Sequence, residues 1–409
     1  MNPKLRLVAA LVGGLLVGAV ATIAVQGGGT SPRSHGSASR SNGAGASSPA
    51  AVAGRAETYL AWVPSSLPAG LAAGIGALDG IDHTTVVAED NTWMTRSWSA
   101  DGQVVDHPPA PFMIPIDAAA VDPRSFRDFL PSADRGVLND LARGQGVVGA
   151  TSSELRGLGP GAVLRFEGGS DVTIAAVLPD ELVGAAEVLV SRATGAEIGI
   201  THDRYVLIQP AGPNLPSARK LANRIRPLLP TTLDPVHRKV VVRAPGETPY
   251  LRQGDAVLPP VLIKALFGEF AARPDPSRPG YLRIDPAWYR QQIETTTVPV
   301  LGPVTCNRAV IPQLRDAMQT VVKRGLAGTI HVYDGCYAPR YINRDPANMI
   351  SHHAWGIAFD CNASTNPVGG TPHQDPRLVR VMEQAGFIWG GTFVVPDGNH
   401  FEYRFTPTT

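Results

Sequence analysis

Ser351-His352-His353-Ala354-Trp355-Gly356-Ile357-Ala358-Phe359-Asp360 and Asp397-Gly398-Asn399-His400-Phe401-Glu402 are the two stretches that decide how the end of this chain folds. Two imidazoles and a carboxylate at these spacings can form a zinc site with three protein ligands, which leaves one coordination position open for water. A further carboxylate, three residues before the last histidine, is placed to accept a proton from that water. The pattern therefore indicates metal-assisted hydrolysis.

The local sequence suggests how these distant residues meet. Gly356 lets the chain bend between His353 and the strand that we expect to end at Asp360. His400 opens a second expected strand. If the two strands are neighbours, His353, Asp360 and His400 can converge on one zinc ion per chain, with Asp397 in the turn at the rim.

The start of the chain resembles an export element. Lys4 and Arg6 precede an uncharged apolar run over residues 7–25, which is typical of a signal peptide or a membrane anchor with its positive end inside. We expect residues 1–26 to be an uncleaved anchor in the cell membrane, with the rest of the chain outside; secretion after cleavage is the alternative. Residues 27–53 are rich in Gly, Ser, Ala and Pro and are expected to be a flexible linker.

The remaining ~355 residues are too many for one typical core, so we expect two domains, over residues 54–244 and 245–409. The chain has 36 basic and 35 acidic side chains. This balance gives no electrostatic footprint for nucleic acid. Short apolar runs and helical patches alternate in both parts, so the expected fold class is α+β throughout.

In residues 54–244 the apolar runs predict strands, and two longer patches predict helices. The strands are expected over residues 84–88, 162–166, 172–177, 187–190 and 205–209, and the helices over residues 124–143 and 217–229. Residues 144–190, including Val177-Leu178-Pro179-Asp180, look like the extracytoplasmic domain of the permease subunits of certain ABC transporters. That resemblance implies a binding or spacer module with a membrane-protein partner.

In residues 245–409 we expect three helices and three strands. The helices are predicted over residues 260–272, 311–326 and 375–385, and the strands over residues 329–333, 357–360 and 400–405. The chain has three cysteines, which in an exported protein predict one disulfide and one leftover thiol. Cys306 and Cys336 flank the middle helix and are the favoured pair; a pairing that uses Cys361 is the alternative.

The Ser-x-His-x-x-Gly-x-Ala-x-Asp and Asp-x-x-His-Phe-Glu patterns together resemble the zinc D-alanyl-D-alanine peptidases, a family that includes carboxypeptidases, dipeptidases and L-alanyl-D-glutamate endopeptidases. The resemblance implies a hedgehog-like zinc peptidase domain with a small antiparallel sheet and helices. It also implies that His353, Asp360 and His400 are zinc ligands and that Asp397 is the catalytic base. His352 could be taken for the ligand, but only His353 has Gly at +3, Ala at +5 and Asp at +7.

Three further residues are candidate parts of the site. The resemblance aligns Arg340 with an arginine that binds substrate or stabilises the developing oxyanion. Ser351, which opens the first motif, is expected to support a ligand. Glu402 either orients a ligand imidazole or belongs to a structural ion pair.

Location and family resemblance together imply the peptide stems of peptidoglycan as the substrate. We expect a D-Ala-D-Ala carboxypeptidase. An L-Ala-D-Glu type endopeptidase is an alternative within the same family. A non-catalytic cell-wall binding or scaffold protein is an alternative from a different class.

Overall fold

The computed structural model describes residues 57–64, 66–212, 216–235, 237–247, 250–255 and 258–404. The expected anchor and linker lie outside these residues. No helix within the described ranges is long and apolar enough to cross a membrane. All described residues belong to one compact unit.

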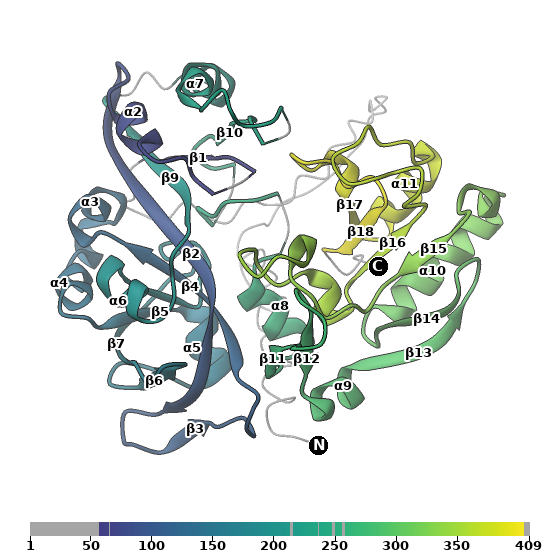
Figure 1. Ribbon diagram of the computed structural model, residues 1–409, viewed down its shortest axis with the longest axis horizontal. Coiled ribbons are helices and arrows are strands. Elements are labelled where there is room, and N and C mark those ends of the chain that lie inside the picture. Colours follow the sequence, from purple (N-terminus) through teal and green to yellow (C-terminus); the bar gives the residue numbers. More distant parts are fainter. Residues whose placement is uncertain are drawn as a thin grey trace, which may run out of the picture. The chain divides into compact units, whose positions relative to one another are not determined.

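A ten-stranded sheet holds the first half of this unit together (Figure 1). Its strands are β1 (Tyr59–Trp62), β2 (Ile81–Trp98), β3 (Val104–Asp106), β4 (Ile114–Val121), β5 (Gly146–Gly149), β6 (Val163–Phe166), β7 (Asp171–Leu178), β8 (Val188–Ser191), β9 (Asp203–Pro210) and β10 (Val241–Arg243). The order along the sheet is β10-β1-β9-β2-β4-β8-β5-β7-β6, with β3 paired to β2. Because β6 also pairs with the end of β2, part of the sheet closes on itself.

Short helices accompany this sheet. They are α2 (Leu71–Gly76), α3 (Pro123–Phe126), α4 (Val137–Ala142), α5 (Ala150–Arg156), α6 (Arg192–Glu197) and α7 (Ala218–Ile225), with 3-10 turns at Arg127–Phe129, Ser132–Asp134 and Arg226–Leu228. The prediction of one helix over residues 124–143 is wrong, because Leu130 is extended before Pro131 and separates α3 from α4. The five predicted strands coincide with parts of β2, β6, β7, β8 and β9.

The second half contains two hairpins and a four-stranded sheet. Its elements are α8 (Pro260–Phe267), β11 (Ala272–Pro274), β12 (Leu282–Ile284), α9 (Pro286–Gln292), β13 (Ile293–Val298), β14 (Gly302–Asn307), α10 (Ile311–Lys323), β15 (Tyr333–Gly335), β16 (Ala358–Cys361), α11 (Pro376–Gln384), β17 (Phe387–Trp389) and β18 (His400–Tyr403), with 3-10 turns at Ala327–Thr329, Ile342–Arg344, His352–Trp355 and Gly390–Thr392. The antiparallel order is β15-β16-β18-β17, and these strands lie together at the yellow-green end of the ribbon (Figure 1). The described residues thus form a mixed α+β structure.

The helix expected over residues 311–326 ends at Lys323, and two further predicted boundaries in this half are wrong. The helix that begins at Pro260 stops at Phe267 rather than at residue 272, because Gly268 has a φ of 83° and takes the chain out of the helix. The strand expected over residues 329–333 begins only at Tyr333, and a 3-10 turn precedes it. By contrast, α11 lies within its predicted range, with Asp375 capping its first turn.

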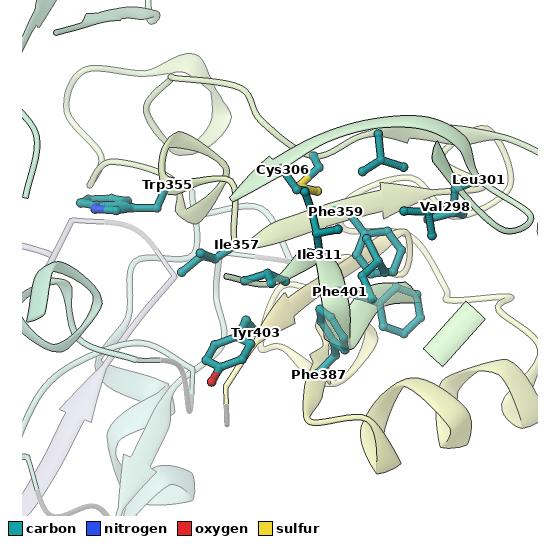
Figure 2. Close-up of a cluster of buried hydrophobic side chains, with 14 of the residues drawn as sticks. Val298, Leu301, Cys306, Ile311, Trp355, Ile357, Phe359, Phe387, Phe401 and Tyr403 are labelled. Carbon is teal, nitrogen blue, oxygen red and sulfur yellow. A yellow bond between two sulfur atoms is a disulfide. The ribbon is translucent and has the colours of Figure 1, made fainter. Parts of the chain in front are cut away.

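One face of the four-stranded sheet is a packed aromatic core. Phe359 stacks on Phe401 with ring centroids 5.4 Å apart and meets Phe387 edge-on at 5.8 Å. Ile311 of α10 belongs to the same buried cluster. Figure 2 shows these side chains gathered together, with the Cys306 sulfur joined in a disulfide beside them. Because side chains alternate along a strand, this packing directs the neighbouring residues of β16 and β18 to the other face.

Gly356 joins the turn that carries His353 to β16. Its φ of 66° lies in the left-handed region, and an added Cβ would lie 2.7 Å from the backbone nitrogen of Asn307. That nitrogen donates a 2.8 Å hydrogen bond to the Gly356 carbonyl, so neither segment can move away easily. The close approach locks the turn against the end of β14.

We expect Gly356→Ala to destabilise the protein. The left-handed backbone costs an alanine about 1–2 kcal/mol, and overpacking against Asn307 adds about 1–3 kcal/mol. Gly302→Ala is the matched control, since Gly302 has a φ of 76° with nothing within 4 Å of its added Cβ. Urea unfolding of both variants measures the difference, and equal destabilisation would contradict the steric argument.

Candidate metal centre

The register between β16 and β18 places two candidate ligands opposite each other. Asp360 pairs directly with His400, so both side chains leave the sheet on the face away from the phenylalanines. Asp360 Oδ1 lies 3.0 Å from His400 Nδ1. The arrangement gives a carboxylate and an imidazole side by side at the end of two strands.

His353 reaches the same point from a 3-10 turn. The Ser351 side chain caps this turn by accepting a hydrogen bond from the His353 backbone N–H. Nδ1 of His353 lies 2.7 Å from the carbonyl oxygen of Cys336, so it carries the proton and donates. Nε2 therefore presents its lone pair, 3.2 Å from Asp360 Oδ1 and 3.2 Å from His400 Nδ1.

Glu402 fixes the other nitrogen of His400. Its Oε2 lies 3.1 Å from His400 Nε2 and 2.9 Å from His352 Nδ1. Burial acts to raise the pKa of Glu402, but the two histidines hold that pKa well below its usual range. Burial opposes the protonation of His400, yet Asp360 and Glu402 raise its pKa to about 10. The Glu402 carboxylate thus orients the ligand candidate His400 and also holds His352 by a hydrogen bond.

The three converging atoms fit a zinc ion. His353 Nε2, Asp360 Oδ1 and His400 Nδ1 are 3.0–3.2 Å from one another, close to the ~3.3 Å between neighbouring ligands held about 2.0 Å from a tetrahedral zinc ion. Each imidazole donates a hydrogen bond from its other nitrogen to an oxygen, which is the support that ligating histidines need. The three ligand candidates are the group of metal-binding side chains that the described structure brings together.

Asp397 lies in the turn before β18. Its backbone N–H donates to the Gly390 carbonyl at 2.8 Å, and Asn399 Nδ2 donates to Asp397 Oδ1 at 2.6 Å. Burial raises the pKa of Asp397 and the charge of Asp360 adds to that, while His400, His353 and Arg340 act in the opposite direction. The carboxylate is therefore held beside the three ligand candidates. Sequence reasoning did not single out Asn399, although it lies inside the second motif.

Arg340 belongs to the loop that precedes the first motif. Its carbonyl accepts a hydrogen bond from Ser351 N–H at 3.0 Å. The Arg340 guanidinium is close enough for its charge to lower the pKa of Asp397. Arg340 and Asp397 are supplied by two different loops.

The cysteines divide into a bridge and a buried thiol. Cys306 and Cys336 form a disulfide with their Cα atoms 5.5 Å apart, which ties β14 to the loop whose carbonyl orients His353. Cys361 is a free, buried thiol, and burial raises its pKa to about 12. It follows Asp360 on the strand and is outside the group of ligand candidates.

A cavity of about 480 Å³ lies beside β17, and its lining contains none of the three ligand candidates, Asp397 or Arg340. Phe393 lines it and lies with its ring 6.0 Å from that of His400. Ile388, directly opposite Glu402 in the sheet, lines it too. The lining holds two basic side chains, Arg243 and Arg404, and two acidic ones, Asp255 and Glu383.

Comparison with known proteins supports the resemblance seen in the motifs. Residues 344–403 match the model of the D-alanyl-D-alanine carboxypeptidase family, a segment that contains the three ligand candidates and Asp397. This part of the chain is similar to a peptidase family whose members use zinc. No curated protein matches the chain.

Two solved structures are similar in backbone to part of the chain. The periplasmic region of MacB from Actinobacillus actinomycetemcomitans has a TM-score of 0.31 and 10% identity, covering 46% of this chain and 88% of that one. The extracellular domain of the noncanonic ABC-type transporter YknZ from Gram-positive bacteria has a TM-score of 0.28 and 15% identity, covering 42% and 92%.

The hydrogen bond from His400 to Glu402 predicts the effect of Glu402→Gln. We expect zinc affinity to fall about tenfold, the lower end of the range for such supporting groups, because the amide oxygen can still accept but carries no charge. Competition with a chromogenic chelator measures this loss. Glu154→Gln, on the exposed side of α5, is the control; equal affinities for the two variants would assign Glu402 to a structural ion pair alone.

Proposed function

We propose that this chain is an extracytoplasmic zinc peptidase that hydrolyses the stem peptides of peptidoglycan, removing the terminal D-alanine. The observation that carries the proposal is the triangle of His353 Nε2, Asp360 Oδ1 and His400 Nδ1 with the Asp397 carboxylate beside it. Three protein ligands with an open position are typical of catalytic zinc sites, whereas structural sites take four and favour cysteine.

A zinc ion bound to these ligands supplies a Lewis acid and lowers the pKa of water to about 7. Asp397 accepts a proton from the attacking water and returns it to the leaving amine. Its orientation is set by the hydrogen bond from Asn399. The Arg340 guanidinium stabilises the negative charge that develops on the peptide oxygen.

The cavity beside β17 supports a peptide substrate. Its lining combines the guanidinium groups of Arg243 and Arg404 with the carboxyl groups of Asp255 and Glu383, so it offers partners for the carboxylate, amide and amine groups of a peptide. Peptidoglycan stems are peptides with free carboxylates. The apolar run over residues 7–25 and the Cys306–Cys336 disulfide favour a position outside the cytoplasm, with the chain anchored in the membrane.

Replacement of the proposed base tests this function. We expect Asp397→Asn to lower kcat on a synthetic stem pentapeptide by about 10²–10⁴-fold, because proton transfer is lost while the ligands stay in place. Zinc content should remain that of the wild type. Mass spectrometry of the products identifies the bond that is cut.

Loss of one D-alanine in the wild-type reaction alone supports the carboxypeptidase. An internal cut moves the protein to the endopeptidase alternative. Stoichiometric zinc without cleavage of any stem peptide contradicts the proposed substrate. Absence of both zinc and cleavage favours the scaffold alternative.

A further inference from the structure

Two loops lead into the metal centre, and residues far earlier in the chain hold both of them. Residues 345–350 precede Ser351 and His353, and residues 390–396 precede Asp397. The positions of the ligands and of the catalytic carboxylate depend on how firmly these loops are held. The contacts that fix them come from β2, β9 and residues 239–255, all outside the segment that matches the peptidase family.

Asn91 of β2 holds the first loop. Its Oδ1 accepts a hydrogen bond from the backbone N–H of Ile350 at 2.9 Å, and its Nδ2 lies 3.7 Å from the sulfur of Met349. Arg204 of β9 donates to the carbonyl of Ala347 at 2.6 Å. Arg204 is itself buried and paired with Asp90 at 2.6 Å, so the first loop rests on a rigid part of the large sheet.

Asp255 holds the second loop. Its Oδ1 accepts a hydrogen bond from the backbone N–H of Val394 at 3.0 Å. Lys239 Nζ donates to the Val394 carbonyl at 2.7 Å. The Val394 side chain packs against a buried cluster that includes Tyr205 and Leu251. Both backbone groups and the side chain of one residue are thus fixed by the earlier part of the chain.

Ile350 and Val394, the two residues held in this way, are close in sequence to functional side chains. Ile350 directly precedes Ser351, whose hydroxyl caps the turn of His353. Val394 is three residues before Asp397, and Phe393 beside it lies next to His400. A backbone N–H that loses its acceptor must find another partner or turn to water, so removal of either acceptor is expected to shift the loop.

We propose that Asn91 and Asp255 are positioning residues for the metal centre: Asn91 sets His353 for zinc binding, and Asp255 sets Asp397 for proton transfer. The inference rests on the proposed function for its catalytic part and on zinc binding for the rest. Residues 57–255 are then part of the catalytic unit, although the three ligand candidates come from the C-terminal motifs.

The two contacts should give different results in the full chain. Asn91→Ala is expected to weaken zinc binding about tenfold, measured by competition with a chromogenic chelator. Asp255→Ala is expected to leave zinc affinity within about twofold and to lower kcat on the stem pentapeptide by tenfold or more, because a small displacement of a catalytic group is costly. Hydrogen–deuterium exchange should rise at residues 345–351 in the first variant and at residues 390–397 in the second.

Two further variants serve as controls. Thr95→Ala removes one side-chain hydrogen bond from the same strand as Asn91, to the carbonyl of Arg165, and should leave zinc affinity and kcat unchanged. Asp255→Asn keeps the Oδ1 acceptor for Val394 and should restore most of the kcat that Asp255→Ala loses.

Several outcomes would overturn the proposal. Variants that melt earlier but keep wild-type zinc affinity, kcat and local exchange would reduce both residues to general structural roles. Equal losses of zinc affinity and kcat in both variants would contradict the separate assignments. If the wild type binds zinc but cleaves no stem peptide, the proposed function fails, while the zinc and exchange measurements still decide whether Asn91 and Asp255 hold the two loops.

Discussion

The antiparallel register between β16 and β18 is the constraint on which the candidate site depends. Pairing Asp360 with His400 brings two ligand atoms to 3.0 Å, and the same register stacks Phe359 on Phe401 on the opposite face. A shift by one residue would send the charged pair into the aromatic core and the phenylalanines to the metal face. Burial of the rings therefore stabilises the one alignment in which the ligands meet.

Much of this local arrangement could be predicted, because its determinants lie within each motif. Alternation along a strand put His400 and Glu402 on one face, and the single flexible residue before β16 marked the bend after His353. The helix over residues 376–384 was also predictable, since Asp375 and Pro376 mark its start. Predicted helix boundaries were wrong where a single residue interrupted a longer helical pattern. Pro131 divided one expected helix, and Gly268 ended another early.

The contacts between the two halves could not be predicted, because nothing in the local sequence encodes a partner more than a hundred residues away. Asn91 lies beyond the strand that was expected over residues 84–88, and Asp255 falls outside every expected element. Their side-chain oxygens accept hydrogen bonds from the backbone N–H groups of Ile350 and Val394. Every residue except proline has such a group, so it leaves no mark in the sequence. Hydrogen bonds from a side chain to a main-chain group far away in sequence therefore cannot be predicted from residue types.

Buried ion pairs also fix later parts of the chain to the large sheet. Glu187 and Arg156, both from the first half, are almost fully buried together with Lys264 of α8, and Glu187 lies 2.6 Å from the lysine. Arg252 similarly bridges Glu89 and Asp117 at 2.6 Å each. Loss of one member of a buried ion pair costs about 3–5 kcal/mol because the other charge is left unpaired. Such groups tolerate little displacement, so they fix α8 and the loop at Arg252 against the large sheet, and the same sheet then serves as a fixed support for the loops of the metal centre.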